Sequence, residues 1–363
     1  MEQAIELAEL GRGLTHPNPL VGAVVMKDRR VVGNGYHRGP HTPHAEVVAL
    51  REAGAAAAGA TLYSTLEPCC HHGRTPPCVG AIIAAGVRRV VVALPDPNPL
   101  VDGRGIAELR RAGLRLTVLE GETAVLARRQ NAAYLKYMRT GLPLVTYKAA
   151  VSLDGKVAAA GGDARWVSGE ESRRLAHAMR ARADAVLIGA GALRRDDPQL
   201  TVRLVPGRDP VAVVVSESGD VPPGAQLFAG ARNRRTILLT RRLSADVEAS
   251  LTLHNVEVML IRGELADGLR ELAQTGLLDI LCEGGPSLAT SLLERGLVDR
   301  LAVFVAPVFV GKGAPEIVSL RAPDTMAGTR RLGAVRWRWV GEDALLEADV
   351  GGGLACSPAS SRK

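Results

Sequence analysis

Residues 43–46 read Pro-His-Ala-Glu, and residues 67–78 read Glu-Pro-Cys-Cys-His-His-Gly-Arg-Thr-Pro-Pro-Cys. The first segment places an imidazole, His44, two residues before a carboxylate, Glu46. The second places two thiols, Cys69 and Cys78, nine residues apart, the first of them directly after a proline. One histidine and two cysteines make a tetrahedral zinc site whose fourth position stays open. Because water bound to zinc ionises near neutral pH, the two segments predict a hydrolytic centre in which Glu46 carries protons.

The same loop offers two other ligand sets. Cys69 with His72 would give a shorter spacing, and a closed structural site could use Cys69 and Cys78 with either Cys70 or His72. We favour Cys69 with Cys78, because Cys78 opens an apolar helical run and the N-terminus of a helix stabilises a thiolate. A closed site would leave the histidine and the glutamate of the first segment without a role. A His-x-Glu followed by Pro-Cys and a second cysteine is typical of zinc nucleobase deaminases, in which the usual gap between the cysteines is shorter.

Length and composition limit the classes to which this protein can belong. The chain has 363 residues, enough for two domains, and its residues are 47% apolar but only 3% aromatic, which predicts cores of alanine, valine and leucine. No run of 18 apolar residues and no signal-peptide pattern appears, so we expect no membrane association. Three of the five cysteines share one loop, whereas Cys282 and Cys356 are isolated. Such usage is typical of a metal site in a reducing compartment, and it predicts a cytoplasmic protein.

The net charge of +7 is spread along the chain. No basic block lies beside an aromatic stripe, so the charge does not favour a nucleic-acid partner. Scattered arginines suit a phosphorylated small molecule at least as well.

Strands and helices alternate along both halves, which predicts an α/β fold. In the first half we expect a β-hairpin over 21–36, a helix over 44–53 and a single helical stretch over 122–139, and the ligands should lie at helix starts beyond strand ends. The Gly-Leu-Pro segment at 141–143 marks the boundary. We therefore expect one domain over 1–142, a second over 143–350, and a disordered Gly/Ser-rich tail over 351–363. The remaining predicted strands lie at 61–66, 88–94, 114–119, 144–151, 185–188, 211–216, 236–239, 256–261, 280–283, 300–306 and 344–349. The other helices are predicted at 2–10, 106–112 and 170–182, and a last one follows the segment 284–288 and ends at Glu294.

Two short segments of the second half have a functional and a structural interpretation. Gly284 and Gly285, between a strand and a helix, could bring backbone N–H groups close to a phosphate, or could serve only the turn. Asp196 and Asp197 could form a metal pair, but without a third carboxylate nearby we favour an N-cap.

With these motifs in hand, the chain resembles the family of bifunctional riboflavin-biosynthesis proteins, in which a pyrimidine deaminase is fused to a reductase. In that family the long Cys-x8-Cys spacing is the usual one, and Cys70 stands where relatives have serine. The matching motifs are His16-Pro17-Asn18-Pro19, His44-Ala45-Glu46, Glu67-Pro68-Cys69 through Cys78, Asp96-Pro97-Asn98-Pro99, Ser152-Leu153-Asp154-Gly155, Asp196-Asp197-Pro198, Thr201-Val202-Arg203 and Glu283-Gly284-Gly285-Pro286.

The resemblance implies a cytidine-deaminase-like three-layer domain followed by a dihydrofolate-reductase-like domain. It implies zinc-dependent deamination of 2,5-diamino-6-(5-phosphoribosylamino)pyrimidin-4-one and NADPH-dependent reduction of the ribosyl group to ribityl. By the same resemblance, His44, Cys69 and Cys78 would bind Zn²⁺ and Glu46 would be catalytic. The residues facing the cofactor would be Ala150, Trp166, Asp196, Ser216, Gly285, Pro286 and Ser287, and those facing the substrate would be Ala164, Arg180, Leu200, Arg203 and Glu283. Ala164 and Ala192 replace expected hydroxyl residues, so they could contribute only backbone contacts.

Two other functions remain open from sequence. A base deaminase acting on RNA would need salt-sensitive RNA binding and would have no use for a second α/β domain. A non-catalytic, zinc-stabilised binding protein would tolerate substitution of Glu46. The small-molecule enzyme could also assemble into a homo-oligomer, which the sequence does not decide.

Overall fold

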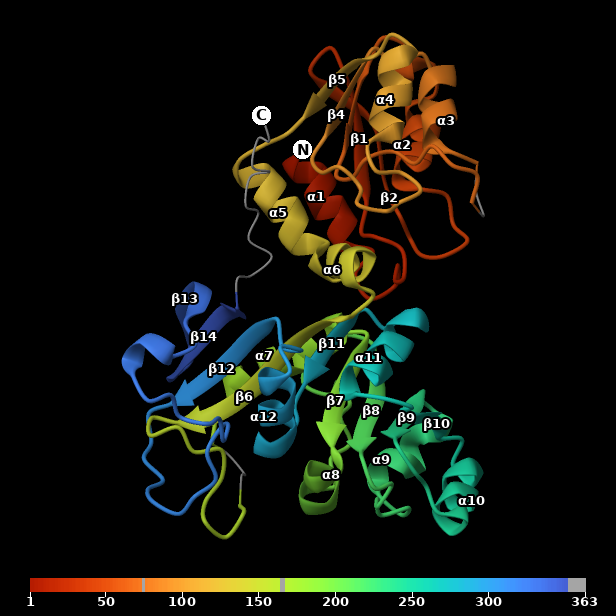
Figure 1. Cartoon of the computed structure of the whole chain (residues 1–363). Helices are drawn as coiled ribbons and strands as arrows, with labels where there is room; N and C mark the ends of the chain where they lie inside the picture. The colour runs from red at the N-terminus through yellow and green to blue at the C-terminus, as the bar shows by residue number, and fades with distance from the viewer. Residues whose placement is uncertain (74–75, 164–166, 352–363) are drawn as a thin grey trace. The chain divides into compact units, whose positions relative to one another are not determined.

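The computed structural model describes residues 1–73, 76–163 and 167–351. The chain divides into two compact units, Met1–Gly141 and Leu142–Lys363, each with its own sheet (Figure 1). Among the described residues, no helix has the length and apolar character needed to cross a bilayer. The predicted sites at Ala164 and Trp166, and the tail from 352 onward, lie outside the described residues.

The first unit is built on a five-stranded mixed sheet. Strand β1 pairs antiparallel with β2 and β3, whereas β3, β4 and β5 are parallel. The strands, in spatial order, are β2 Arg30–Tyr36, β1 Gly22–Lys27, β3 Thr61–Ser64, β4 Arg89–Val92 and β5 Arg115–Val118. The helices are α1 Glu2–Glu9, α2 Ala45–Ala53, α3 Cys78–Ala84, α4 Arg104–Arg111, α5 Glu122–Gln130 and α6 Ala132–Thr140, with a 3₁₀ turn at Gly54–Ala57.

Helices cover both faces of this sheet, and glycines in the strands allow them to approach closely. A Cβ on Gly22 would lie 1.9 Å from the carbonyl oxygen of Ala4 in α1, and one on Gly33 would lie 2.2 Å from that of Ala49 in α2. Gly22 and Gly33 point to opposite faces, because Gly33 pairs with Val25, three residues after Gly22. The three-layer arrangement predicted for this half is therefore confirmed, and Figure 1 shows α2, α3 and α4 together.

The helical stretch predicted over 122–139 is interrupted. It forms two helices, α5 and α6, that meet at Asn131. The buried side chain of Asn131 accepts from the backbone N–H of Leu20 and donates to the carbonyl of Leu20, both at 2.8 Å. A side-chain amide that bonds a distant backbone competes with continued helix. The prediction of one helix was wrong because this long-range contact does not appear in the local pattern.

The second unit is built on a nine-stranded sheet in which the two terminal strands at one edge are antiparallel. The other seven strands are parallel, from β10 to β12. In spatial order the strands are β10 Glu257–Leu260, β9 Thr236–Thr240, β8 Val211–Ser216, β7 Ala185–Gly189, β11 Asp279–Cys282, β6 Leu144–Ser152, β12 Arg300–Ala306, β14 Asp343–Val350 and β13 Leu332–Val340.

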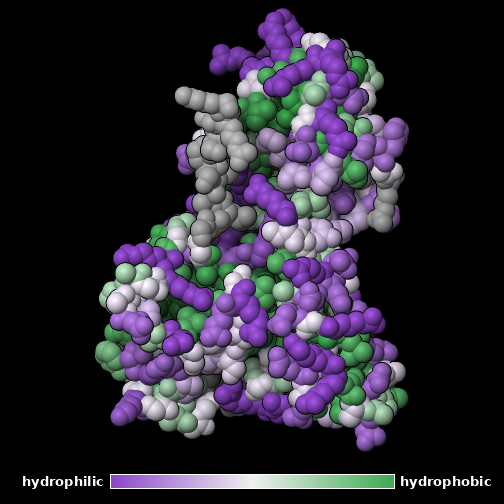
Figure 2. Space-filling view, in the orientation of Figure 1, coloured by the Kyte–Doolittle hydropathy of each residue, from purple (hydrophilic) through white to green (hydrophobic). Residues whose placement is uncertain are grey.

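Helices bury both faces of the parallel part. Along β8, Val213 and Val215 enter one core, whereas Ala212 and Val214 enter the other, as expected where a parallel sheet is covered on both sides. Hydrophilic residues cover much of the face seen in Figure 2. The helices are α7 Glu170–Arg182, α8 Ala190–Asp196, α9 Gln226–Ala229, α10 Ala245–Leu253, α11 Leu265–Gln274 and α12 Pro286–Glu294, with 3₁₀ turns at Gly230–Arg232 and Met326–Gly328.

The predicted α/β class is confirmed for both halves, with two local corrections. Asp196 and Asp197 do not begin a helix, because Asp196 is the last residue of α8 and Asp197 is its C-cap. The strand β13, for which no prediction was made, alternates tryptophan with arginine over 336–339 and is largely exposed. Its period-two pattern is that of a strand, but its exposure removes the apolar run by which buried strands are recognised.

Candidate functional site

Three metal-binding side chains meet in the first unit. The Nδ1 atom of His44 lies 3.1 Å from Sγ of Cys78 and 3.4 Å from Sγ of Cys69. All three ligand atoms lie within 4.8 Å of one another. A tetrahedral zinc with bonds of about 2.0–2.3 Å would separate such atoms by roughly 3.5 Å. The donor set and its spacing therefore suit a zinc ion with one position left open.

The backbone explains why these three side chains converge. His44 is the N-cap of α2, Cys69 follows the strand β3, and Cys78 opens α3 after Pro77. The backbone N–H of Cys78 donates to Sγ of Cys69 at 3.3 Å. Both helix N-termini thus point their positive ends at the cluster, which favours thiolates.

The pKa values of the two thiols are shifted in opposite directions. Hydrogen bonding to Cys78, and then to His44, lowers the pKa of Cys69 to about 4. The same pairing with Cys69, together with burial, raises the pKa of Cys78. The hydrogen bond with Cys69 raises the pKa of His44. The lowered pKa of Cys69 favours a thiolate beside the imidazole of His44.

Glu46 lies beside the cluster and is 3% exposed. Its Oε2 atom accepts from Sγ of Cys78 at 3.6 Å and its Oε1 atom from the hydroxyl of Ser64 at 3.4 Å. Burial raises the pKa of this carboxyl group. A carboxyl group with a raised pKa is suited to accept and return a proton near neutral pH.

The alternative ligands suggested by the sequence do not join this group. Within residues 1–73, 76–163 and 167–351, the metal-binding cluster consists of His44, Cys69 and Cys78. The Sγ atom of Cys70 instead donates to the carbonyl of Leu100 at 3.7 Å. The arrangement favours the open three-ligand site over a closed structural one.

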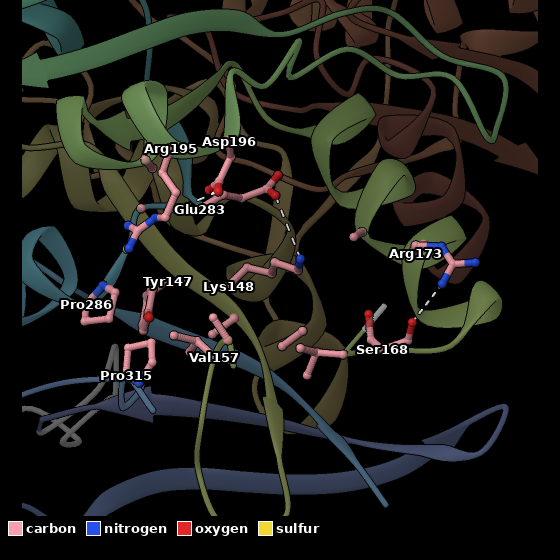
Figure 3. A pocket seen from close by; sticks show the side chains of 18 of the residues that line it. Tyr147, Lys148, Val157, Ser168, Arg173, Arg195, Asp196, Glu283, Pro286 and Pro315 are labelled. Carbon is pink, nitrogen blue, oxygen red and sulfur yellow. Dashed lines mark hydrogen bonds and ion pairs between the residues drawn. The ribbon is translucent and has the colours of Figure 1, made fainter. Parts of the chain in front are cut away.

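The second unit contains a cavity of about 410 Å³ at the carboxyl ends of its central strands, a volume typical of small-molecule sites. Strands β6 and β11, helices α7 and α8, and the start of α12 contribute to its wall. In Figure 3, Lys148 extends toward Glu283, and Arg195 lies beside Asp196, with which it forms an ion pair of 3.9 Å. Arg173 and Ser168 form another part of the wall, joined by a hydrogen bond of 2.8 Å.

A charged group forms the floor of this cavity. The guanidinium of Arg180 donates twice to the Glu283 carboxylate, at 2.5 and 2.9 Å, and the Lys148 ammonium lies 3.8 Å from it. Burial would raise the pKa of Glu283, but Arg180 and Lys148 outweigh that effect and lower it to about 2. Glu283 is therefore a fixed anion that holds two cations toward the cavity.

Most of the predicted reductase residues surround the cavity, and three do not. Leu200 is 3% exposed within the hydrophobic core. Ser216 ends β8, where its hydroxyl donates to the carbonyl of Asp220, and Ser287 is exposed in the first turn of α12. The predicted residues that line the cavity are Ala150, Arg180, Asp196, Arg203, Glu283, Gly285 and Pro286, and Ala192 lines it as well.

Two cavity residues were missed from sequence. Lys148 is a lysine within the otherwise uncharged strand β6, and His177 is a histidine on the buried side of α7. The backbone N–H of Arg203 donates to Nδ1 of His177 at 2.9 Å. A lone charged residue inside a buried strand was the available signal for Lys148; nothing in the local pattern distinguished His177 from a core histidine.

The turn between β11 and α12 suits an anionic cofactor. Gly285 is the N-cap of α12 and Pro286 is its first residue. A Cβ at Gly285 would lie 3.5 Å from the guanidinium of Arg195, so glycine keeps the backbone and this cation accessible together. Free N–H groups at a helix start beside an arginine favour a phosphate. The residues of the cavity thus fit a nicotinamide dinucleotide phosphate.

Comparison with known proteins covers both halves. Residues 1–94 match the cytidine and deoxycytidylate deaminase zinc-binding region, and residues 143–346 match the RibD C-terminal domain. The chain is 44% identical over 315 residues to the riboflavin biosynthesis protein RibD of Aquifex aeolicus, covering 86% of this chain and 87% of that protein. It is 39% identical to the RibD protein of Escherichia coli, covering 95% of this chain and 97% of that protein.

Solved structures resemble the chain across both halves. A RibD structure from Acinetobacter baumannii superposes with a TM-score of 0.87 at 37% identity, covering 96% of this chain and 97% of that one. A diaminohydroxyphosphoribosylaminopyrimidine deaminase/5-amino-6-(5-phosphoribosylamino)uracil reductase from Thermotoga maritima superposes with a TM-score of 0.84 at 33% identity, with the same coverage.

Proposed function

Because the chain belongs to the RibD family of bifunctional riboflavin-biosynthesis enzymes, we propose that its two activities are divided between the two units. The protein is a zinc-dependent deaminase and an NADPH-dependent reductase that acts on small molecules. The deaminase occupies residues 1–142 and the reductase residues 143–350. The RNA-acting deaminase and the non-catalytic binding protein are not favoured, because the RibD relatives extend across both halves.

The deaminase acts on 2,5-diamino-6-(5-phosphoribosylamino)pyrimidin-4-one. His44, Cys69 and Cys78 would hold the zinc, which would supply a Lewis acid that makes water easier to deprotonate. Glu46 would accept the two protons of the attacking water in turn, returning one to the ring nitrogen and the other to the departing amine, which leaves as ammonia. The single observation that carries this assignment is the buried Glu46 carboxyl group 3.6 Å from the Cys78 sulfur.

The reductase converts the ribosyl group of the deaminated product to ribityl, and NADPH supplies the hydride. Most of the work of this site is positioning. The turn at Gly285, Pro286 and Ser287 binds cofactor phosphate on the backbone N–H groups of Gly285 and Ser287, because proline has none. Ala150 and Asp196 line the cavity beside this turn, and Ser216 and Trp166 are the other cofactor residues of the proposal. Arg203 binds the 5′-phosphate of the substrate, because a guanidinium matches a phosphate with two hydrogen bonds.

The other substrate contacts are less direct. Arg180 is held by Glu283, so it contributes a neutralised, rigid pair to the substrate site. Leu200, whose side chain is in the core, and Ala164 would contribute backbone groups.

Incubation of the purified full chain with the diaminopyrimidine phosphate tests the proposal. Ammonia should be released without NADPH, and NADPH oxidation should require either that deamination or pre-deaminated substrate. Ammonia release and NADPH oxidation are measured separately in the same sample. Absence of ammonia release from zinc-loaded protein would contradict the deaminase, and absence of NADPH oxidation with pre-deaminated substrate would contradict the reductase.

We also propose that the chain forms a homo-oligomer in the cytoplasm. Strand β13 ends the nine-stranded sheet and leaves Trp337 and Trp339 at 60% and 77% exposure. An open strand edge with exposed aromatic side chains favours pairing with a second copy. Free thiols at Cys69, Cys78 and the buried Cys282 support a reducing compartment. Light scattering should find an oligomer that Trp337→Ser shifts toward monomer.

A further inference from the structure

Glu67, two residues before Cys69, is a buried carboxylate that the proposed mechanism does not use. Its side chain is 3% exposed, yet it belongs to the loop that carries a zinc ligand. Three backbone N–H groups donate to it, from Asp96 at 3.2 Å, Gly103 at 3.1 Å and Ile106 at 3.0 Å. A carboxylate offers only acceptors, so all three donors are matched by one side chain.

Two of these donors belong to the start of helix α4. Gly103 is the N-cap of that helix, where it has no side chain to offer, and Ile106 lies in the first turn. Helix N-termini leave N–H groups unsatisfied and favour a negative charge. Glu67 therefore caps α4 from a segment 36 residues away in the chain.

The same segment is in close contact with the first turn of α4. A Cβ at Gly105 would lie 2.1 Å from the carbonyl oxygen of Pro68 and 3.2 Å from Oε1 of Glu67. The backbone N–H of Glu67 donates to the carbonyl of Leu94 at 2.8 Å. The residues directly before Cys69 are thus fixed against both the end of β4 and the start of α4.

Cys69 is held from its other side by helix α3. The backbone N–H of Val79 donates to the carbonyl of Cys69 at 3.2 Å, and that of Cys78 donates to its sulfur at 3.3 Å. Cys69 therefore lies between two anchors, one supplied by α3 and the other by α4 through Glu67.

We propose that Glu67 is a positioning residue for the zinc centre, which fixes Cys69 by tying its loop to the N-terminus of α4. The inference rests on the proposed ligand set. Partners that orient metal ligands typically contribute about 10–100-fold to metal affinity or activity. In Glu67→Gln an amide NH₂ would face N–H donors, so the clamp would lose acceptors without losing volume.

The test compares zinc-loaded full-length Glu67→Gln with the parent chain. Zinc transfer to an excess of a chromophoric chelator should be about 10-fold faster or more, and the deaminase kcat should fall by a similar factor with little change in KM. NADPH oxidation with pre-deaminated substrate should be unchanged.

Two controls are matched to this variant. Glu52→Gln removes a carboxylate that also accepts a backbone N–H, from Asn34 at 3.0 Å, but at an exposed site. Val90→Ala destabilises the same unit from its buried sheet.

The outcomes distinguish the positioning role of Glu67 from the proposed set of zinc ligands. Fast zinc release by Glu67→Gln, with slow release by both controls, supports the positioning role. Release from Glu67→Gln at the parent rate overturns it, and so does equally fast release from a Val90→Ala protein of the same unfolding free energy. A Cys69→Ser protein that kept a full equivalent of zinc would instead overturn the proposed ligand set.

Discussion

The two halves each bury a glutamate beside cationic or metal-binding groups, and the two carboxyl groups are tuned in opposite directions. Burial raises the pKa of Glu46. Glu283 is largely buried, with its side chain 10% exposed, but the neighbouring Arg180 and Lys148 lower its pKa to about 2. Burial alone therefore does not set the role of a carboxyl group. At Glu46 burial outweighs the opposing charge of His44 and leaves a group that can exchange a proton. At Glu283 two cations outweigh burial and leave a permanent anion that holds them in place.

The two sites also differ in how they are assembled. The zinc cluster draws its ligands from residues 44–78, at the starts of two helices and after one strand. The cavity draws its wall from residues 147–315, on elements that only the sheet brings together. Coordination chemistry restricts both residue type and spacing, whereas a cavity depends on the packing of whole elements.

Removing a metal ligand should have the largest effect. The loss of activity should be confined to the first unit. Cys78→Ser replaces a buried thiol at the start of α3 by a much poorer zinc ligand. Metal analysis should find less than one equivalent of zinc, and ammonia release should fall to background. NADPH oxidation with pre-deaminated substrate should persist. Loss of both activities in a folded protein would show that the sites are not independent.

Neutralising the proton carrier should preserve the metal. Glu46→Gln keeps the shape of the side chain but cannot carry a proton, so ammonia release should fall by about 10²–10⁴. Zinc content should stay at one equivalent, and Cys70→Ser serves as a control that should retain both zinc and activity. Near-normal ammonia release by Glu46→Gln would exclude Glu46 as the proton carrier.

In the cavity, removal of a single charge should affect binding more than turnover. Arg203→Ala removes a guanidinium whose hydrogen bonds to a charged phosphate contribute about 1.5–3 kcal/mol. The reductase KM for the phosphorylated substrate should therefore rise about tenfold or more, with little change in the KM for NADPH and with intact deamination. Arg270→Ala, which removes an exposed arginine paired with Asp267, is the matched control. An unchanged substrate KM would place the phosphate elsewhere in the second unit.

The smallest predicted effect is that of His177 on the pH dependence of the unfolding free energy. Burial, followed by the charges of Arg180 and Arg203, lowers its pKa to about 4, below the usual value of about 6.5 in an unfolded chain. Between these values the unfolded chain binds more protons, so His177 makes the protein less stable as pH falls from about 6.5 to about 4.

Denaturant unfolding at several pH values measures this contribution. The parent chain should lose more unfolding free energy across the interval than His177→Gln does. Equal slopes for the two proteins would mean that His177 is not held neutral in the folded state.

The convergence of His44, Cys69 and Cys78 could be predicted from sequence, because each lies near the start of a helix or after a strand and metal chemistry restricts their residue types. His44 and Glu46 share one helix start, and Cys78 opens the helix that its apolar run predicted. The hairpin followed for the same reason: Asp28 and Arg29 form its turn with positive φ values of 48° and 62°.

The features that could not be predicted from the sequence depend on contacts between residues far apart in the chain. The break at Asn131 is imposed by Leu20, and Lys148 meets its charged partner Glu283, which lies 135 residues further along the chain, only in the folded protein. Leu200 matches the family motif, yet its side chain is directed into the core. Sequence identified these residues by type or by resemblance, but it could not determine the direction of their side chains.

The position of the tryptophans gives the two units separate optical signals. All three tryptophans lie in the second unit, at 166, 337 and 339, and Trp337 and Trp339 are exposed on β13. The first unit contains tyrosines but no tryptophan. Emission excited at the red edge of the indole band therefore originates from the reductase half alone. In a single sample, indole fluorescence can follow the unfolding of that half, while zinc release reports independently on the other.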